Sequence, residues 1–320
     1  MSRPWKVKCL IDTAKWALPF QQRLRELKDR VAGYQREPKK DAVTIRDGLT
    51  LIEWLGNVSG ATVLEIGTGW QPMIPILFSL AGARVYMADL HRLMRTDTFA
   101  AALDAIRENR DEIAGRLQID PGAVDRAARD CQDMESRLQE LGLTYLAPCD
   151  CRSLPFAPGC IDIVNSRAVL EHVPPAIIAA IFREAYRVLG PGGRMVHLVD
   201  HSDHWSHRDP AISAVNFLQY PDWLFRFTCI SPQNYQNRLR HPEYVALLEA
   251  AGFVVTREQT TVSPACLDAL SSLRIAERFR RFHPEDLATT SSILLAGPRG
   301  TGVRAGGESP LHGLSRVAGP

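Results

Sequence analysis

The chain has 320 residues, of which 45% are hydrophobic and 23% charged, and its formal net charge is +2. This composition is typical of a globular protein with a substantial core, and so small a net charge gives no electrostatic support for a nucleic-acid partner. The seven cysteines are scattered and no signal peptide leads the chain, which together favour a reducing compartment and a cytoplasmic location. The sequence holds no apolar run of the roughly 18–20 residues that a membrane span needs.

Residues 1–57 are expected to form a helical segment ahead of the main domain. Residues 1–41 are basic, with aromatic and aliphatic residues among the lysines and arginines, and helices are predicted at about 19–32 and 42–57. We favour a role as a cap over a binding site or as a contact in a homodimer. Docking on a membrane surface is the alternative interpretation.

Two apolar runs carry the first functional signal. The run at 61–66 leads into a turn with two glycines, Gly67 and Gly69, and the run at 84–88 is followed by Asp89. Glycines after a strand let the backbone approach a ligand, and the N-terminus of the following helix favours an anionic group. In a doubly wound sheet an acid at the end of the next strand lies beside that turn and accepts hydrogen bonds from ribose hydroxyls. The runs indicate a nucleoside-type cofactor on a Rossmann-like sheet.

Strand and helix patterns alternate along the rest of the chain, which predicts a mainly parallel sheet within a domain at 58–297. Strands are predicted at 61–66, 84–88, 143–148, 161–165, 193–199, 253–258 and 291–296. The first helix of this domain is expected to begin at Pro72. An insertion at about 91–142 is expected to be helical and to break at Asp120-Pro121-Gly122. Segments at 200–240 and 259–289 are expected to build an acceptor side, and residues 298–320 to form a disordered tail.

Five elements of the sequence resemble, in order and spacing, the class I S-adenosylmethionine-dependent methyltransferases of bacterial type. They are Leu64–Gly69, Asp89, Cys149–Cys151 with Leu154–Phe156, Ile161–Ser166 running into Val169–Val173, and Arg187–Gly193. The resemblance implies a Rossmann-like, doubly wound, seven-stranded sheet whose last strand is antiparallel, and S-adenosyl-L-methionine as cofactor. One departure is that the usual third glycine falls at Gln71, with the bulky Trp70 before it.

The same resemblance implies a set of cofactor-binding residues: Glu65, Gly67, Gly69, Asp89, Asp150, Cys151, Asn165 and Ser166. Asp89 is expected to bind the ribose hydroxyls and Asp150 the adenine amino group, with a backbone contact from Cys151. Asn165 and Ser166 are expected near the methionine portion. Each has a structural alternative, such as a helix cap for Asp150.

Histidines and aspartates are concentrated at residues 200–209, directly after the fifth predicted strand. Ligands of open parallel sheets bind outside the carboxyl ends of the strands, so this stretch is expected beside a ligand. A histidine with a pKa near neutrality is suited to take a proton from a hydroxyl acceptor. His201 or His204 is the candidate general base, with Asp203 or Asp200 fixing its tautomer.

His172, which follows the fourth predicted strand, is a further candidate to orient the acceptor or to move a proton, whereas its neighbour Glu171 is open to a structural role. An alternative is a metal site such as that of catechol-type methyltransferases, but the spacing specifies no metal geometry and no metal is assigned. Its ligands would be Asp200, His201, His204 and His207. A third interpretation is a polar loop whose histidines bond the backbone.

Tyr220, Arg238 and Arg240 are the candidate substrate-binding residues. Two guanidinium groups are suited to a carboxylate or phosphate, and aromatic side chains to a sugar or another ring. Ion pairs and core packing are the alternatives. The cysteines at 149, 151 and 160 are interpreted as buried thiols rather than zinc ligands.

These patterns predict an enzyme that transfers a methyl group from S-adenosylmethionine to an oxygen of a small-molecule, natural-product or saccharide acceptor. The reaction is expected to be an in-line displacement with proton removal by histidine. The alternatives are a metal-dependent O-methyltransferase and a non-catalytic or non-methylating S-adenosylmethionine-binding protein. Nicotinamide binding is disfavoured by the absence of the third glycine.

Overall fold

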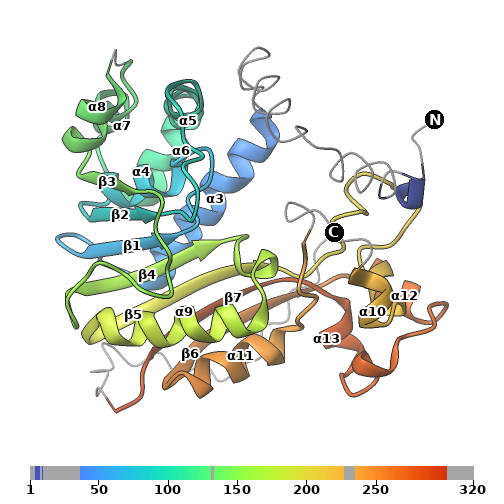
Figure 1. Cartoon of the computed structure of the whole chain (residues 1–320). Helices are drawn as coiled ribbons and strands as arrows, with labels where there is room; N and C mark the ends of the chain where they lie inside the picture. Colours follow the sequence, from blue (N-terminus) through green and yellow to red (C-terminus); the bar gives the residue numbers. More distant parts are fainter. Residues whose placement is uncertain (1–3, 8, 10–36, 131–132, 227–234, 301–320) are drawn as a thin grey trace, which may run out of the picture.

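A computed structural model describes residues 4–7, 9, 37–130, 133–226 and 235–300. Its centre is a seven-stranded sheet in the order β3-β2-β1-β4-β5-β7-β6 (Figure 1). The strands are β1 (Thr62–Ile66), β2 (Arg84–Ala88), β3 (Leu143–Leu146), β4 (Ile161–Arg167), β5 (Leu189–Asp200), β6 (Phe253–Val262) and β7 (Thr289–Pro298). The first five strands pair in parallel, and β7 runs antiparallel to both of its neighbours. The predicted fold class, with the last strand reversed, is confirmed.

Helices cover both faces of the sheet, because successive strand residues point to opposite sides. Val63 packs with α3 (Pro38–Leu55), α4 (Met73–Leu80) and α5 (Thr96–Glu108), whereas Leu64 packs with α9 (Pro175–Val188) and α11 (His241–Ala250). The buried side of α9 follows helical spacing: Ile178, Ile181, Phe182, Ala185 and Val188. Because α3 shares the core of β1 and β2, the domain includes this helix, which was predicted at 42–57 as part of a separate segment.

The helical insertion between β2 and β3 differs from the single break that was predicted. It contains four helices, α5, α6 (Arg110–Leu117), α7 (Pro121–Ala127) and α8 (Met134–Glu140). Asp120 caps α7 by accepting from the N–H of Gly122, and Pro121 occupies the first turn as expected. The described residues thus show two breaks besides the predicted one, and the break at Asn109 has no proline or glycine to announce it. The predicted start of α4 also shifts, from Pro72 to Met73.

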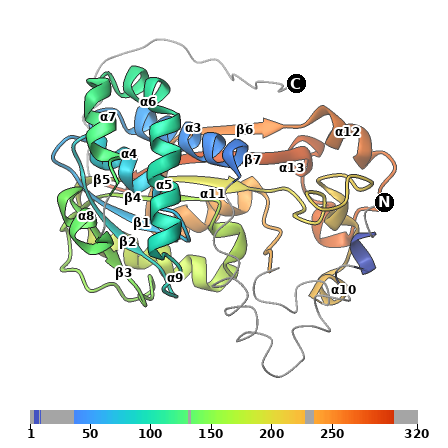
Figure 2. The same ribbon diagram turned by 90° about the horizontal axis from the view of Figure 1, so that it is seen from above.

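A second hydrophobic cluster joins the two segments after β5 and β6. Phe217 in η2 (Asn216–Gln219) and Phe225 in α10 (Asp222–Arg226) pack against α12 (Pro264–Leu270), η4 (Glu277–Phe279) and α13 (Pro284–Ala288). The short N-terminal helical turn, drawn in blue, lies near α10 (Figure 2). The ring of Trp5 is 6.1 Å from that of Trp205, and the Trp5 backbone N–H donates to Asp209. The segments at 200–240 and 259–289 therefore form one unit; their acceptor role stays a prediction.

Two predictions concern residues whose structure is not described. The helix predicted at 19–32 and the tail from residue 301 lie outside the described residues. Pro298, placed in the tail by the sequence, is the last residue of β7. Among the helices that the model describes, none is long and apolar enough to cross a membrane.

Candidate functional site

The turn after β1 needs its glycines for two different reasons. Gly67 and Gly69 have φ angles of +74° and +73°, a region that side chains with a Cβ disfavour. At Gly67 an added Cβ would also stand 2.8 Å from both methyl carbons of Val169, whereas at Gly69 it would meet nothing within 4 Å. Residues 67–71, here called the glycine turn, are thus held against the segment that follows β4.

Glu65 supports the glycine turn from inside the sheet. Its side chain is buried, and the Thr68 hydroxyl donates a hydrogen bond to its carboxylate. Burial raises the pKa of Glu65 to about 8, with the Thr68 bond opposing the rise and the charge of Asp89 adding to it. Asn165 lies opposite Glu65 in the β1–β4 register. Its side-chain amide, fully buried, has no hydrogen-bond partner among the described residues.

Asp89 joins the ends of three strands. It follows β2, and its Oδ2 accepts the Gly69 N–H at 3.0 Å and the hydroxyl of Tyr145, from β3, at 3.2 Å. Burial raises its pKa to about 6, although both hydrogen bonds favour the charged form. The carbonyl of Asp89 accepts the N–H of Cys149 at 2.7 Å. The predicted residues Gly67, Gly69 and Asp89 therefore lie together, with the segment at 149–151 beside them.

The structure gives Asp150, Cys151 and Ser166 partners of their own. The Asp150 carboxylate accepts from the guanidinium of Arg152 and is 40% exposed. Cys151 is buried, and burial raises the pKa of its thiol to about 12, as expected of an inert thiol. Ser166 lies 2.8 Å from Nδ1 of His197, whose ring packs against Phe182 of α9, so its hydroxyl already has a partner; its place near the methionine portion stays a prediction.

Glu171, His172 and His204 meet beyond the ends of β4 and β5, and we call them the Glu–His–His cluster. Each offers one ligand-type atom, and the three atoms lie within 4.8 Å of one another. Glu171 is 3% exposed, and burial raises its pKa to about 8. The rings of His172 and His204 have centroids 4.9 Å apart. Sequence reasoning left Glu171 open to a structural role, since only the fold shows it beside two imidazoles.

Hydrogen bonds set the state of each imidazole. Nδ1 of His172 lies 2.9 Å from the carbonyl oxygen of Tyr235, which can only accept, so Nδ1 carries the proton and Nε2 keeps its lone pair. Although the residue is exposed at the surface, the groups packed around its ring partly desolvate it, which lowers the pKa of His172 and favours this neutral form. Nε2 of His204 lies 3.2 Å from Oδ2 of Asp200. Burial disfavours ionisation of Asp200, but its bonds with His204 and Ser202 lower its pKa to about 2.

His201 and Asp203 do not act as predicted. His201 is buried: its Nδ1 donates to the carbonyl of Leu239 at 3.1 Å, and its Nε2 lies 2.8 Å from the Ser292 hydroxyl. Burial, with the nearby Arg240, lowers its pKa well below the ordinary value, and neither nitrogen is available to an acceptor. Asp203 bonds the N–H of Trp205 and the amide of Asn216 instead of fixing a histidine tautomer. The aspartate that lies beside a histidine ring is Asp200, 3.2 Å from Nε2 of His204.

Arg238 and Arg240 are structural rather than substrate-binding. The Arg238 guanidinium donates to the carbonyls of Phe217 and Tyr220 and pairs with Asp222. The Arg240 side chain has no exposed surface and donates to a set of main-chain carbonyls: His201, Asp286, Leu287 and Thr289. Both side chains lock the segments after β5 and β6 together. Tyr220, half-buried with its ring 5.7 Å from Trp5, keeps its predicted role as a proposal.

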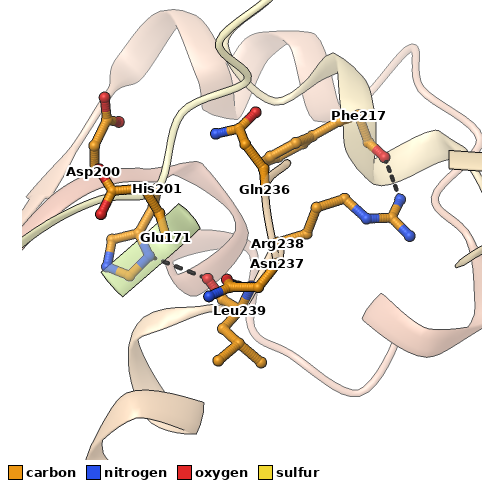
Figure 3. A pocket seen from close by; sticks show the side chains of 8 residues that line it. All are labelled: Glu171, Asp200, His201, Phe217, Gln236, Asn237, Arg238 and Leu239. Carbon is orange, nitrogen blue, oxygen red and sulfur yellow. Dashed lines mark hydrogen bonds between the residues drawn. The ribbon is translucent and has the colours of Figure 1, made fainter. Parts of the chain in front are cut away.

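The segment Tyr235–Arg240 holds the two histidine-bearing loops together. Asn237 donates to the carbonyls of Leu170 and Val173, and Gln236 bonds both the carbonyl of Ser202 and the N–H of His204. A narrow crevice with about 160 Å³ of empty space lies here (Figure 3). It is lined by Glu171, Asp200, His201, Phe217, Gln236, Asn237, Arg238 and Leu239. Gln236 and Asn237 were not singled out from the sequence, because nothing local announces such long-range contacts.

Comparisons with known proteins agree with this arrangement. Residues 116–197, which include β3, β4 and α9, match the model of a family described as a methyltransferase domain. A comparison with curated protein sequences returns no match.

Solved structures similar to the chain include three methyltransferases. One is an S-adenosylmethionine-dependent methyltransferase from Mesorhizobium loti (16% identity, TM-score 0.44, covering 77% of this chain and 95% of that one). Another is the magnesium protoporphyrin IX methyltransferase of Synechocystis with bound SAH (16% identity, TM-score 0.45, covering 88% of this chain and 95% of that one). The third is the geranyl diphosphate C-methyltransferase of Streptomyces coelicolor (14% identity, TM-score 0.44, covering 79% of this chain and 80% of that one). Because these TM-scores lie below 0.5, the assignment rests on the other observations.

Those observations are independent of one another. The family model covers residues 116–197, the seven-stranded sheet has the reversed last strand that the resemblance implied, and Gly69 and Asp89 are hydrogen-bonded at its carboxyl edge. The family match and the sheet topology support the class I S-adenosylmethionine-dependent methyltransferase that the motifs indicated.

Proposed function

We propose that the protein transfers the methyl group of S-adenosylmethionine to an oxygen of a small-molecule or saccharide acceptor. The observation that carries this proposal is the Glu–His–His cluster, which follows β4 and β5. The adjoining strands β1 and β2 end in the glycine turn and Asp89. Because these strands are parallel, their carboxyl ends share one edge of the sheet. Cofactor-binding and proton-accepting groups are therefore neighbours.

The cofactor would lie over the glycine turn. Asp89 accepts the ribose hydroxyls, and the missing Cβ at Gly67 and Gly69 lets the backbone approach the amino-acid end. Glu65 and Asn165, buried side by side beneath the turn, favour the cationic amino group at that end. Asp150 is the candidate for the adenine amino group, which would share the Asp150 carboxylate with Arg152.

The proposed chemistry is an in-line displacement at the sulfonium methyl group. The acceptor oxygen attacks the methyl carbon, an oxygen–carbon bond forms, the carbon–sulfur bond breaks, and S-adenosylhomocysteine leaves as a neutral sulfide. The hydroxyl proton passes to Nε2 of His172, whose lone pair is kept free by the Nδ1 bond to Tyr235. Asp200, 3.2 Å from Nε2 of His204, orients that ring beside His172.

An oxygen acceptor fits these groups better than an amine. A neutral amine has its own lone pair and needs no base, whereas a hydroxyl must lose its proton during the attack. Tyr220 supplies an aromatic face, which suits stacking on a ring or sugar substrate. The net charge of +2 adds no attraction for nucleic acid.

The test uses purified full-length protein and S-adenosylmethionine carrying a labelled methyl group. It is incubated with bacterial extract separated into glycan, lipid, protein, nucleic-acid and small-molecule pools. We expect label in the glycan or small-molecule pool, its loss in Asp89→Ala, and a drop of about 100-fold in His172→Ala. His283→Ala is the matched control and should keep full activity, because His283 is an exposed histidine at the N-cap of α13.

The outcomes separate the alternatives. Label in the protein or nucleic-acid pool would overturn the acceptor class while leaving methyl transfer in place. Cofactor binding by calorimetry without label in any pool would favour a binding protein with no turnover.

A further inference from the structure

We propose that the Glu–His–His cluster is a binding site for one divalent transition-metal ion of the zinc class. The carboxylate of Glu171 and one ring nitrogen each of His172 and His204 lie within 4.8 Å of one another. Ligand atoms around a tetrahedral zinc stand roughly 3.4 Å apart, since each bond is about 2.1 Å long. The three side chains would therefore close by about 1 Å around an ion.

The strongest support is the Glu171 carboxylate. It is 3% exposed, and within the part of the chain that the structure describes no side chain donates to it; only the backbone N–H groups of Glu171 and Asp200 approach its oxygens. A buried carboxylate without a side-chain partner is costly by several kcal/mol. A cation at this position would satisfy both oxygens at once. Glu171 also lines the narrow crevice together with Asp200 (Figure 3).

The histidines have the surroundings that metal ligands have. An imidazole ligand as a rule donates its other N–H to a carbonyl or carboxylate, which fixes the ring and its tautomer. Nδ1 of His172 does this with the carbonyl of Tyr235. Asp200, 3.2 Å from Nε2 of His204, is the matching carboxylate for the second ring. The backbone of the cluster is held as well, because Asn237 donates its N–H to the carbonyl of Glu171.

The donor set selects the class of ion. Two imidazoles and one carboxylate suit zinc, cobalt, iron and manganese, whereas magnesium and calcium prefer sites made only of oxygen. Three protein ligands also leave at least one position open, as in catalytic rather than structural zinc sites. The ligand set differs from the one considered from the sequence, because His201 is bonded to Leu239 and Ser292, and His207 lies beside Ser202.

The ion would change how the acceptor loses its proton. A hydroxyl bound at the open position has its pKa lowered by the metal, so it ionises before attack and its proton leaves to water. His172 and His204 then act as ligands instead of as free bases. This consequence rests on the proposed function, whereas the binding of the ion does not.

The test measures metal binding by the full chain without reference to turnover. Protein stripped with a chelator is titrated with Co²⁺, and bound cobalt is followed by its visible d–d absorption and by elemental analysis. We expect one ion per chain, displaced by Zn²⁺. Glu171→Gln, His172→Ala and His204→Ala should each weaken binding at least about tenfold. His207→Ala, whose ring stacks on His204 but lies outside the cluster, is the control and should bind normally.

Circular dichroism and cofactor affinity of each variant verify that it is folded. No stoichiometric binding by the parent protein, or equal binding by Glu171→Gln and His172→Ala, would overturn the site. Methyl transfer at full rate by metal-free protein would remove the catalytic role of the ion and leave the proposed function intact. Stoichiometric cobalt binding without methyl transfer would leave the site standing while the proposed function fails.

Discussion

The backbone N–H of Gly69 donates a hydrogen bond to Oδ2 of Asp89 across 3.0 Å, which ties the glycine turn to the end of β2. The hydroxyl of Tyr145 donates to the same oxygen. Oδ1, 3.3 Å from the Gly69 nitrogen, is the less engaged atom and the natural acceptor for a ribose hydroxyl. We therefore expect cofactor affinity to depend on the charge of Asp89.

Affinity for S-adenosylmethionine should fall as the pH drops below about 6. Burial raises the pKa of Asp89 to about 6, so the carboxylate is neutralised at a pH where most aspartates stay charged. The protonated acid accepts hydrogen bonds more weakly. Calorimetric titration of the parent protein and of Asp89→Asn between pH 5 and 8 checks this. The variant should bind at least about tenfold more weakly at pH 8 and lack the change in affinity near pH 6.

The free energy of unfolding should depend on the ionisation of Asp89 in the opposite sense to cofactor affinity, and should fall as the pH rises. A raised carboxyl pKa contributes stability that is present below its ordinary value of 3.8 and is lost as the pH rises through about 6. Asp89→Asn should therefore gain in free energy of unfolding relative to the parent across that range. The ionisable groups around Asp89 are Glu65, His91, Tyr145 and Cys151. If the stability difference were independent of pH, Asp89 would not be the group responsible.

Alanine at Gly67 should be far more damaging than alanine at Gly69. Both substitutions impose a Cβ at positive φ, at about 1 kcal/mol each. Only at residue 67 does the new carbon also collide with Val169, 2.8 Å away, which adds about 1–3 kcal/mol. Chemical denaturation of the two variants gives the difference directly. Adding Val169→Ala to Gly67→Ala should recover part of the loss, and no recovery would contradict the packing argument.

The sheet and the glycine turn were predictable because their signals are local. An apolar run such as residues 61–66, followed by glycines and an acid one strand later, places a turn and its partner without knowledge of the rest of the chain. The N-terminal part of β5 was not predicted, since Gly190–Gly193 has the composition of a turn. Nevertheless β5 begins at Leu189, which pairs with Ile161 of β4.

The acceptor side was predicted less well because its contacts are distant in sequence. His201 and His204 are equivalent in composition and both follow β5, yet His201 points to Ser292 on β7 and His204 to the loop after β4. Nothing within residues 200–209 distinguishes them. The same holds for Arg240, whose partners at 286–289 come from another segment. Sequence patterns identify residue types suited to chemistry, but the fold decides which of them remain available.

Replacing Arg240 should destabilise the fold without a specific effect on substrate affinity. The buried guanidinium is the donor for the carbonyls of His201 and Leu287, among others, and Arg240→Met would leave them unpaired. We expect a loss of about 3–5 kcal/mol in free energy of unfolding. Arg240→Lys should recover little, because one ammonium cannot reach the same set of carbonyls. Arg226→Met, an exposed arginine in α10, is the control and should change stability by less than about 0.5 kcal/mol.

Alanine substitutions at His201 and His172 should affect different properties, stability in the first case and activity in the second. His201→Ala leaves the Leu239 carbonyl and the Ser292 hydroxyl without a partner in the core, and should lower the free energy of unfolding by about 2–3 kcal/mol. Its turnover per folded molecule should stay close to that of the parent protein. His172→Ala should do the reverse, because His172 is exposed but belongs to the Glu–His–His cluster. Denaturation curves and initial rates, both taken well below the melting temperature, measure the two effects. A His201→Ala protein that is fully stable but inactive would contradict this prediction and identify His201 as the general base. The reason is that loss of a buried histidine with a purely structural role must lower the free energy of unfolding.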